Sequence, residues 1–467
     1  MRRWLSVLLY SAAGSLHANQ FFPLSVLYRN MEYYFIGIKG SGMASLATIV
    51  FDRHEQVSGS DIDKYIFTQK PLEERHIPIY HFDENNIKEG MTIIIGNAFN
   101  ESNPEVKKAM ELAKQGKVQV YWYHDFLGQL VEEYTSISVA GTHGKTTTTG
   151  MISHVMAEVA PTGFLIGDGT GDMPDDGEYF VLESCEYQRH FLAYKPQYAI
   201  ITNIELDHVD YYKNMEDYRD AFETFANQVK KGIVLFGDDE EVRRLHVKTK
   251  HLYYGLQDDN DVQAVHVIQN EEGMSFDVLY KKAYFGSFKL PFVGKPLLWN
   301  SLGVIALGIM EGLQPAVLQE GLASFPGVKR RFTIEEKNGN VYIDDYAHHP
   351  TAVKYMIEAA RIKYPDKKII AIFKPDRYSR IYYFMDRFAQ ELDQADETYL
   401  CHFPENAAKE PGINITIQDL ADRCAHAQVI QEDETAAKFL ADRGPAVYLF
   451  MSSKDIYKLK NIVKSFQ

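Results

Sequence analysis

Cysteine is scarce in this chain of 467 residues. Cys185, Cys401 and Cys424 are the only three, and they are widely spaced. An odd number of scattered cysteines argues against a disulfide framework and against a zinc ribbon, and it favours a reducing compartment. We therefore interpret all three as ordinary thiols and expect a cytoplasmic protein.

Long apolar segments and an excess of positive charge are missing as well. Beyond the first thirty residues, no segment approaches the ~20 uninterrupted apolar residues that a membrane span requires, so we expect no membrane insertion. The net charge of −15 disfavours general nucleic-acid binding, although a local basic pocket for phosphates can lie inside an acidic envelope. The apolar content of 45% is ordinary for a globular chain, and the length suggests roughly three domains.

The first thirty residues differ from the rest. They open with "MRRWLSVLLYSAAGSLHA", whose two arginines, apolar stretch and small-residue end permit a signal peptide. A strand followed by a glycine loop begins at Met31, and nothing downstream resembles an exported, disulfide-bearing domain. We therefore favour an upstream extension over residues 1–30 that is not part of the fold, and a signal peptide is the alternative.

The remainder divides into three α/β blocks. Short apolar runs alternate with helical stretches and turn residues over 31–134, 135–326 and 327–467, a pattern typical of mostly parallel sheets with flanking helices. We predict a Rossmann-like first domain, a central domain of the P-loop ATPase type and a Rossmann-like third domain. A Pro-Gly break and a basic cluster in "SFPGVKRRF" indicate a hinge before the third domain. Because open sheets bind ligands at the carboxyl ends of their strands, polar clusters at those ends are the candidate functional sites.

A glycine-rich turn follows the first predicted strand. Backbone N–H groups in such a turn can approach a pyrophosphate at a helix N-terminus, although glycines can also serve turn geometry alone. The spacing is not G-x-G-x-x-G, so a nicotinamide cofactor is poorly supported. Ser60 and Asp61 follow about twenty residues later, where a carboxylate can bind a ribose hydroxyl. The candidate residues of the turn are Gly37, Lys39, Gly40, Ser41, Gly42 and Met43.

A second loop, "SVAGTHGKTTTTG", is a shortened form of the phosphate-binding G-x-x-x-x-G-K-[ST] loop. Its backbone amides can wrap phosphate oxygens, Lys145 can neutralise the β- and γ-phosphate charge, and the Thr146 hydroxyl can bind Mg²⁺. A chance match in a chain of this length is of order a few per cent. The candidate nucleotide-binding residues of this loop are Gly141, Thr142, His143, Gly144, Lys145, Thr146 and Thr147.

Two acidic clusters supply candidate metal ligands. Glu183 ends the apolar run in "YFVLES", and Glu186 follows three residues later. Magnesium takes oxygen ligands and keeps several waters, so one carboxylate per ion suffices beside substrate phosphates. A lone histidine such as His208 is more often a hydrogen-bonded structural residue than a ligand. The second cluster, in "IELDHVD", contains Glu205, Asp207, His208 and Asp210.

These motifs occur together with several others. The full set is "YYFIGIKGSGMASLA", "GSDIDKYIFTQ", "AGTHGKTTTTGM", "FLIGDGTG", "ESCEYQRHFL", "ITNIELDH", "GVKRRF" and "DDYAHHPT". In combination they resemble the Mur ligases from about Met31 to near the C-terminus, and that family uses the shortened lysine loop. The resemblance implies ATP and Mg²⁺ as cofactors, and UDP-N-acetylmuramate and L-alanine as substrates, in cytoplasmic peptidoglycan precursor synthesis.

The resemblance also implies a reaction, ATP-driven amide formation. The lactyl carboxylate of the nucleotide sugar attacks the γ-phosphate to give an acyl phosphate, and the amine of the amino acid then displaces phosphate. Because the first two reactants are both anionic, cations must cancel their repulsion while the site holds them in line.

Residue roles follow from the same resemblance. It implies that Lys145, Glu183 and His208 are catalytic and that Thr146, Glu183 and His208 bind magnesium. His208 is therefore interpreted as a functional residue and no longer as a structural one. The glycine-rich turn and the residues after the second strand match the UDP-sugar site. The further implied nucleotide-binding residues are Asn300, Arg330 and Asp345, and the further substrate-binding residues are His348, His349 and Arg380.

Several positions depart from the family pattern. Pro296 and Leu297 replace a His-Asn pair, Asp376 and Ile381 replace a histidine and a threonine, and Ser452-Ser453-Lys454 replaces a Gly-Ala-Gly turn. They leave two alternatives open: a related ligase that adds another amino acid or a peptide to the same nucleotide sugar, and a catalytically silent regulatory paralogue. The retained phosphate-loop and metal residues argue against the silent paralogue.

The first prediction concerns the nucleotide base. Pro296 and Leu297 offer no side-chain donor or acceptor, so base recognition should depend on backbone groups, Asn300 and apolar packing, which discriminate less well than hydrogen bonds. We expect weaker discrimination between ATP and GTP than in relatives with the His-Asn pair, measured as relative kcat/KM, and partial recovery in a Pro296→His, Leu297→Asn double variant. Strong ATP selectivity in the unmodified protein would show that other residues recognise the base.

Overall fold

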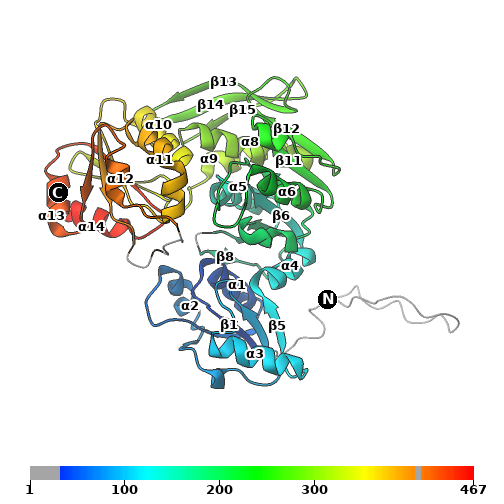
Figure 1. Cartoon of the computed structure of the whole chain (residues 1–467). Helices are drawn as coiled ribbons and strands as arrows, with labels where there is room; N and C mark the ends of the chain where they lie inside the picture. Colours follow the sequence, from blue (N-terminus) through cyan, green and yellow to red (C-terminus); the bar gives the residue numbers. More distant parts are fainter. Residues whose placement is uncertain (1–31, 168, 405–406, 408–411) are drawn as a thin grey trace.

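Three sheets, one in each predicted block, organise the chain (Figure 1). The computed structural model describes residues 32–167, 169–404, 407 and 412–467, so residues 1–30, the expected extension, lie outside the described residues. The predicted fold class, three α/β domains on mostly parallel sheets, is confirmed. Within the described part of the chain, no helix is long and apolar enough to cross a membrane.

The first sheet is wholly parallel and has the strand order β3-β2-β1-β4-β5. Strand β1 pairs with β2 on one side and β4 on the other, so the direction of winding changes at the strand that precedes the glycine-rich turn. Ligands bind at such a switch point in open sheets. The elements are β1 (Glu32–Ile36), α1 (Ser41–Asp52), β2 (Gln56–Ser60), η2 (Phe67–Gln69), α2 (Lys70–Glu74), β3 (Ile79–Tyr80), η3 (Glu84–Asn86), β4 (Thr92–Ile95), α3 (Pro104–Lys114), β5 (Gln119–Trp122) and α4 (Tyr123–Glu133).

The two faces of this sheet are covered by different helices. In β1, Tyr34 and Ile36 pack in one apolar cluster with α3, whereas Tyr33 and Phe35 pack in another with α1 and α4. This division follows from the two-residue period of a strand. The strand itself is therefore almost completely buried, as expected for a parallel sheet.

The central sheet has the order β15-β14-β13-β12-β11-β10-β6-β9-β7-β8. Strand β6, which precedes the lysine loop, lies between β9 and β10, which precede the two acidic clusters, so the three strands end at the same edge. The elements are β6 (Thr135–Ala140), α5 (Lys145–Ala157), β7 (Thr162–Leu165), β8 (Gly171–Asp172), β9 (Tyr179–Glu183), η4 (Tyr187–Ala193), β10 (Tyr198–Ile201), α6 (Met215–Ala226), β11 (Gly232–Phe236), α7 (Glu240–Arg243), β12 (His251–Gly255), β13 (Val262–Asn270), β14 (Gly273–Tyr280), β15 (Ala283–Leu290), α8 (Lys295–Met310) and α9 (Pro315–Ser324).

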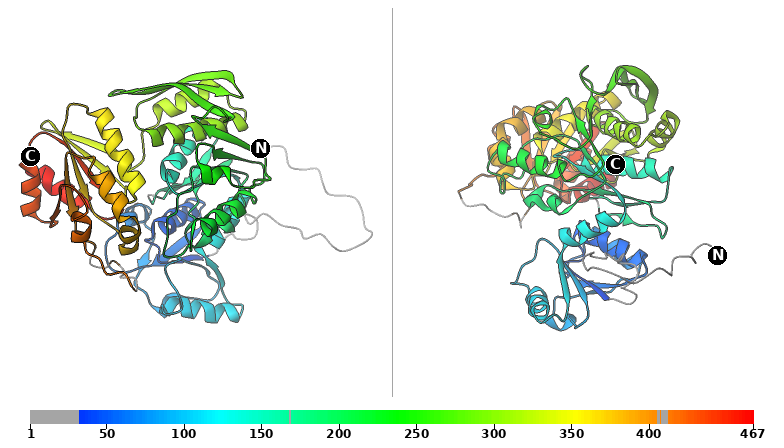
Figure 2. Two further views of the ribbon diagram at one scale, coloured as in Figure 1. Left: turned by 45° about the horizontal axis from the view of Figure 1, so that its top comes forward. Right: turned by 90° about the vertical axis from the view of Figure 1, so that its right-hand side faces the viewer.

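The third sheet has the order β16-β17-β21-β18-β19-β20 and is parallel except for the edge strand β16. Figure 2 shows this domain beside the central domain and the first domain below both. The elements are β16 (Thr333–Lys337), β17 (Asn340–Asp345), α10 (Pro350–Lys363), β18 (Ile369–Phe373), α11 (Tyr378–Leu392), β19 (Glu397–Cys401), α12 (Ile417–Ala421), β20 (Ala427–Ile430), α13 (Glu434–Ala441), β21 (Val447–Met451) and α14 (Tyr457–Ser465).

The first and central domains share one apolar core. Leu127 and Leu130 of α4 belong to the same buried cluster as Phe191 of η4 in the central domain. Gly128 lets the two backbones approach, because a Cβ at this position would lie 2.6 Å from the carbonyl oxygen of Ala193. The third domain instead has apolar clusters of its own.

This close approach generates a stability prediction. Gly128→Ala should lower the free energy of unfolding by about 1–3 kcal/mol through overpacking, although alanine is favoured over glycine in a helix by ~1 kcal/mol. The midpoint of urea unfolding measures the change. Gln129→Ala, at the exposed next position of the same helix, is the control and should leave the midpoint nearly unchanged. A higher midpoint for Gly128→Ala would contradict the proposed contact.

Candidate active site

The lysine loop connects β6 to α5 through two glycines that other residues cannot replace. Gly141 and Gly144 have φ angles of +133° and +85°, a region that L side chains rarely adopt. A Cβ at Gly144 would lie 2.6 Å from Oδ1 of Asn300, so helix α8 reaches this loop. The backbone N–H groups of Thr142 and His143 donate to the carbonyl and side-chain oxygens of Asn203, which fixes the loop against the end of β10.

Lys145 is held by a buried carboxylate. Its ammonium group lies 2.9 Å from Oε2 of Glu186 and also donates to the carbonyl oxygen of Gly141. Burial alone would lower the pKa of Lys145, but the carboxylates of Glu186 and Glu183 outweigh that effect and raise it. In Glu186, burial acts against ionisation, yet Lys145 and His208 lower its pKa to about 2. Both groups are therefore charged at neutral pH.

Thr146 and Glu183 meet beside the lysine. The Thr146 hydroxyl donates to Oε2 of Glu183 at 2.9 Å, and the N–H of Gly167 donates to the same oxygen at 3.0 Å. Sequence reasoning did not select Arg331, whose guanidinium donates to the Thr146 hydroxyl at 2.9 Å. A cation from the linker to the third domain thus reaches the first turn of α5.

Arg330 points in another direction. Its guanidinium donates to the carbonyl oxygens of Ser452 and Lys454, both at 2.7 Å, and so holds the turn after β21. Its implied role in ATP binding therefore stays a prediction. Two adjacent arginines follow the Pro-Gly break, and no sequence signal shows which of them faces the phosphate loop.

His208 lies against Glu186 rather than beside Thr146. Its Nε2 is 3.4 Å from Oε1 of Glu186, and its ring packs on Tyr187. Its Nδ1 is buried without a hydrogen-bond partner, which leaves a ligand atom available. Thr146 and Glu183, which are in contact, offer the oxygen ligands that magnesium prefers. His208 contacts Glu186 instead, so its role as a further magnesium ligand stays a prediction.

The glycine-rich turn is braced from two sides. The N–H of Lys39 donates to Asp61 at 2.7 Å, and the Lys39 ammonium donates to the carbonyl oxygen of Ile62 at 2.8 Å. The Ser60 hydroxyl donates to the buried carboxylate of Glu105. In this arrangement Lys39, Ser60 and Asp61 shape the turn, and the N-terminal N–H groups of α1 are the groups that can meet a phosphate.

Tyr123 is another residue that sequence reasoning missed. A Cβ at Gly42 would lie 2.5 Å from the Tyr123 hydroxyl, so the first residue of α4 borders the glycine-rich turn. Burial raises its pKa, and the neighbouring Cys185 and Glu183 add to the effect. The hydroxyl therefore stays protonated between the predicted sugar-nucleotide and magnesium sites.

Arg380 connects the third domain to the central domain. Its guanidinium lies 2.9 Å from Asp207 of the central domain and also pairs with Asp376 of its own domain. The Ser453 hydroxyl donates to Asp376 at 3.2 Å. Two departures from the family pattern, Asp376 and Ser453, are thus in direct contact and belong to one network with the predicted substrate residue Arg380.

The other predicted residues of the third domain lie around this network. Asp345 accepts from the N–H groups of Phe332 and Ala347 at 2.8 and 2.7 Å, so it shapes the start of the domain. His348 is half-buried near Arg380, and desolvation followed by the charge of Arg380 lowers its pKa to about 4. His349 is the N-cap residue of α10 and lies 3.7 Å from Glu205.

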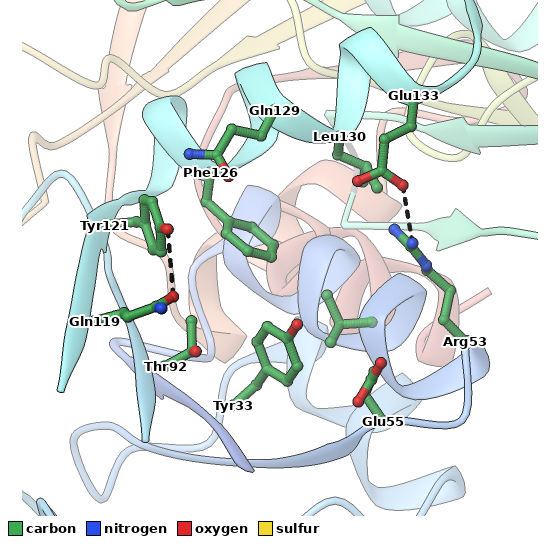
Figure 3. Close-up of a pocket in the computed structure, with 11 residues that line it drawn as sticks. Tyr33, Arg53, Glu55, Thr92, Gln119, Tyr121, Phe126, Gln129, Leu130 and Glu133 are labelled. Atoms are coloured by element: carbon green, nitrogen blue, oxygen red, sulfur yellow. Dashed lines mark hydrogen bonds and ion pairs between the residues drawn. The ribbon is translucent and has the colours of Figure 1, made fainter. Parts of the chain in front are cut away.

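A pocket in the first domain is not part of this site. Tyr33, Thr92 and Gln119 line it together with α4 (Figure 3). They occupy the amino-terminal ends of β1, β4 and β5. The glycine-rich turn follows the carboxyl end of β1, so the pocket lies at the opposite edge of the sheet.

Comparisons with known proteins agree with this geometry. The family model described as "Mur ligase family, catalytic domain" matches residues 32–135, "Mur ligase middle domain" matches 139–308, and "Mur ligase, glutamate ligase domain" matches 330–453. The chain is 47% identical over 431 residues to UDP-N-acetylmuramate–L-alanine ligase of Lactiplantibacillus plantarum, a match that covers 92% of this chain and 97% of that protein. The chain belongs to the Mur ligase family.

Solved structures resemble this Mur ligase over nearly its whole length. The UDP-N-acetylmuramate-alanine ligase of Thermotoga maritima matches with a TM-score of 0.76 at 25% identity, covering 94% of this chain and 99% of that one. A murein peptide ligase of Psychrobacter arcticus matches with a TM-score of 0.68 at 22% identity, covering 94% and 98%. The second likeness supports the fold alone.

The two linker arginines of this Mur ligase allow a paired prediction. Arg331→Ala should lower kcat by about 10²–10³-fold, because it removes a cation beside the phosphate loop. Arg330→Ala should mainly lower the unfolding midpoint, because it releases the turn after β21. Steady-state phosphate release and urea unfolding measure the two effects. A loss of kcat in Arg330→Ala equal to that in Arg331→Ala would show that both arginines act on the nucleotide.

Proposed function

We propose that this chain is an ATP-dependent ligase that joins L-alanine to the lactyl carboxylate of UDP-N-acetylmuramate. The observation that carries the proposal is the match to a protein named UDP-N-acetylmuramate–L-alanine ligase. The two sequences are 47% identical, and the match covers 97% of that protein. The phosphate loop with its paired lysine supports the ATP-dependent part of the reaction.

Each of the three domains has its own role in the proposed reaction. Residues 31–134 bind the UDP sugar at the glycine-rich turn, residues 135–326 bind ATP, and residues 327–467 bring the amino acid and close over the nucleotide. Two contacts across the domain boundary support the last role: Arg331 with Thr146, and Arg380 with Asp207. Through these contacts, two arginines from residues 327–467 lie at the edge of the central sheet where β6, β9 and β10 end.

In the first step, an oxygen of the lactyl carboxylate forms a bond to the γ-phosphorus of ATP, and ADP leaves. Lys145 keeps its proton, because Glu186 raises its pKa, and so offers a permanent positive charge to the phosphates. Arg331 adds a second positive charge beside Thr146. A bound Mg²⁺, held by Thr146, Glu183 and His208, would further neutralise the phosphate oxygens.

In the second step, the amine nitrogen of L-alanine attacks the acyl carbon, phosphate leaves, and the nitrogen loses a proton. Arg380 is the proposed contact for the carboxylate of the amino acid, but its Nε and Nη2 already donate to Asp207 and its Nη1 to Asp376, so it would bind that carboxylate with two parallel hydrogen bonds only after releasing Asp207. Asp207 and Asp376 already hold this guanidinium in place. The proposed setting is cytoplasmic peptidoglycan precursor synthesis, where ATP and nucleotide sugars are available.

The contact between Asp376 and Ser453 motivates the second candidate, a ligase that adds a different amino acid or a peptide. Both residues differ from the family pattern, and both lie in the network of Arg380. A change there would alter the amine that is accepted and leave the attack on ATP unaffected.

Phosphate release with ATP, Mg²⁺ and UDP-N-acetylmuramate across a panel of amino acids and short peptides tests both candidates. We expect L-alanine to give the highest kcat/KM. Lys145→Ala should lower turnover by about 10²–10³-fold or more, because the γ-phosphate charge is then uncompensated, while cooperative unfolding is retained. Preference for another amine would support the second candidate. Phosphate release in Lys145→Ala close to that of the parent would reject the assigned role of the lysine, and no release with any amine would support a silent paralogue.

A further inference from the structure

Glu205 lies where the phosphate loop meets the third domain. It follows β10 of the central domain, and its carboxylate contacts His143 of the phosphate loop. From the third domain, it meets His349 and Thr351 at the start of α10 and Arg387 of α11. One carboxylate therefore connects two domains and the loop that is predicted to bind ATP.

The two oxygens of Glu205 have different surroundings. Oε1 accepts a hydrogen bond from the Thr351 hydroxyl at 2.8 Å and lies 2.9 Å from the Arg387 guanidinium. Oε2 lies 2.9 Å from Nε2 of His143 and 3.7 Å from Nδ1 of His349. Oε1 is thus already occupied by two donors, whereas Oε2 faces the two imidazoles.

His349 presents a lone pair toward this carboxylate. Its side chain is fully buried, and its Nδ1 is the acceptor for the N–H of Thr351 at the start of α10, at a long 3.4 Å. Because Nδ1 accepts this hydrogen bond, the ring proton is on Nε2, which is buried without a hydrogen-bond partner. Two acceptors, Nδ1 of His349 and Oε2 of Glu205, consequently face each other.

One ligand atom from each of His143, Glu205 and His349 lies within 4.8 Å of the other two. Metal bonds of about 2.0–2.2 Å to nitrogen and oxygen place neighbouring ligand atoms roughly 3–4 Å apart, so a single ion fits among the three with small side-chain movements. A cation there would also remove the conflict between the two facing acceptors. We propose that His143, Glu205 and His349 form a site for a divalent transition-metal ion such as Zn²⁺, separate from the magnesium site.

The ligand set decides between ions. Two imidazole nitrogens and one carboxylate suit Zn²⁺, whereas Mg²⁺ prefers oxygen ligands in an octahedral arrangement. Three protein ligands leave a fourth position for a water or a phosphate oxygen. Because His143 belongs to the phosphate loop, the site borders the predicted nucleotide site.

An ion at this site would connect two domains. Two of the ligands belong to the central domain and the third to α10, so the ion stabilises the arrangement in which these domains touch and opposes their separation. Zn²⁺ would therefore act as an inhibitor if product release needs the third domain to open. This inference does not depend on which amine the ligase accepts.

Equilibrium dialysis of Zn²⁺ against chelator-treated, full-length protein without nucleotide tests the site. The background carries Glu183→Gln and His208→Gln, which remove the proposed magnesium ligands and keep the three residues of the new site. Adding His349→Ala should weaken Zn²⁺ binding by about 10-fold or more. It should also abolish the rise in unfolding temperature that Zn²⁺ causes in the background protein.

Two further variants complete the test. His143→Gln changes a partly exposed ligand, so it tests the site even if His349→Ala fails to fold. It should weaken Zn²⁺ binding to a similar extent. His246→Ala is the matched control, because His246 also lies beside a carboxylate, 3.1 Å from Glu223, but is exposed and belongs to no group of three candidate ligands among the described residues. Unchanged Zn²⁺ affinity in a folded His349→Ala or His143→Gln variant, or an equal loss in His246→Ala, would overturn the proposal.

Discussion

The phosphate loop depends on one buried ion pair, that of Lys145 with Glu186. The carboxylate is 1% exposed and the lysine side chain 12%, and the Tyr218 hydroxyl donates to the same carboxylate at 3.1 Å. Breaking such a pair by removing one partner typically costs about 3–5 kcal/mol, because the other charge remains buried. The end of β9, the start of α5 and helix α6 are therefore held together by a charge that the reaction also needs.

The pair also orients the lysine before any nucleotide arrives. Its ammonium donates to the Gly141 carbonyl and so lies within the loop. A preorganised cation loses little conformational freedom when phosphate binds. Glu186 is then best understood as the residue that keeps this cation charged and in place, although its position after β9 equally fits a metal ligand when only the sequence is known.

The sequence predicted the positions of the site better than its contacts. Strand ends, glycine turns and the lysine loop are local signals, and they placed the clusters after β1, β6, β9 and β10. Contacts between distant segments have no such signal. The choice between Arg330 and Arg331 depends on backbone direction after the Pro-Gly break, where Arg330 has a φ of +56°. Lys39 was likewise predicted as a residue of the sugar-nucleotide site from its place in the glycine-rich turn, and the sequence has no signal that its ammonium binds the backbone beyond β2.

The direct contact between Asp376 and Ser453 has a consequence for how this protein can vary. Each of the two residues departs from the family pattern. The Ser453 hydroxyl donates to the Asp376 carboxylate, and the same carboxylate pairs with Arg380. If only the turn with Asp376 were transplanted into a related ligase, its largely buried carboxylate would lack the hydrogen bond from Ser453. The turns after β18 and β21 should therefore change together during evolution, and a chimera has to contain both.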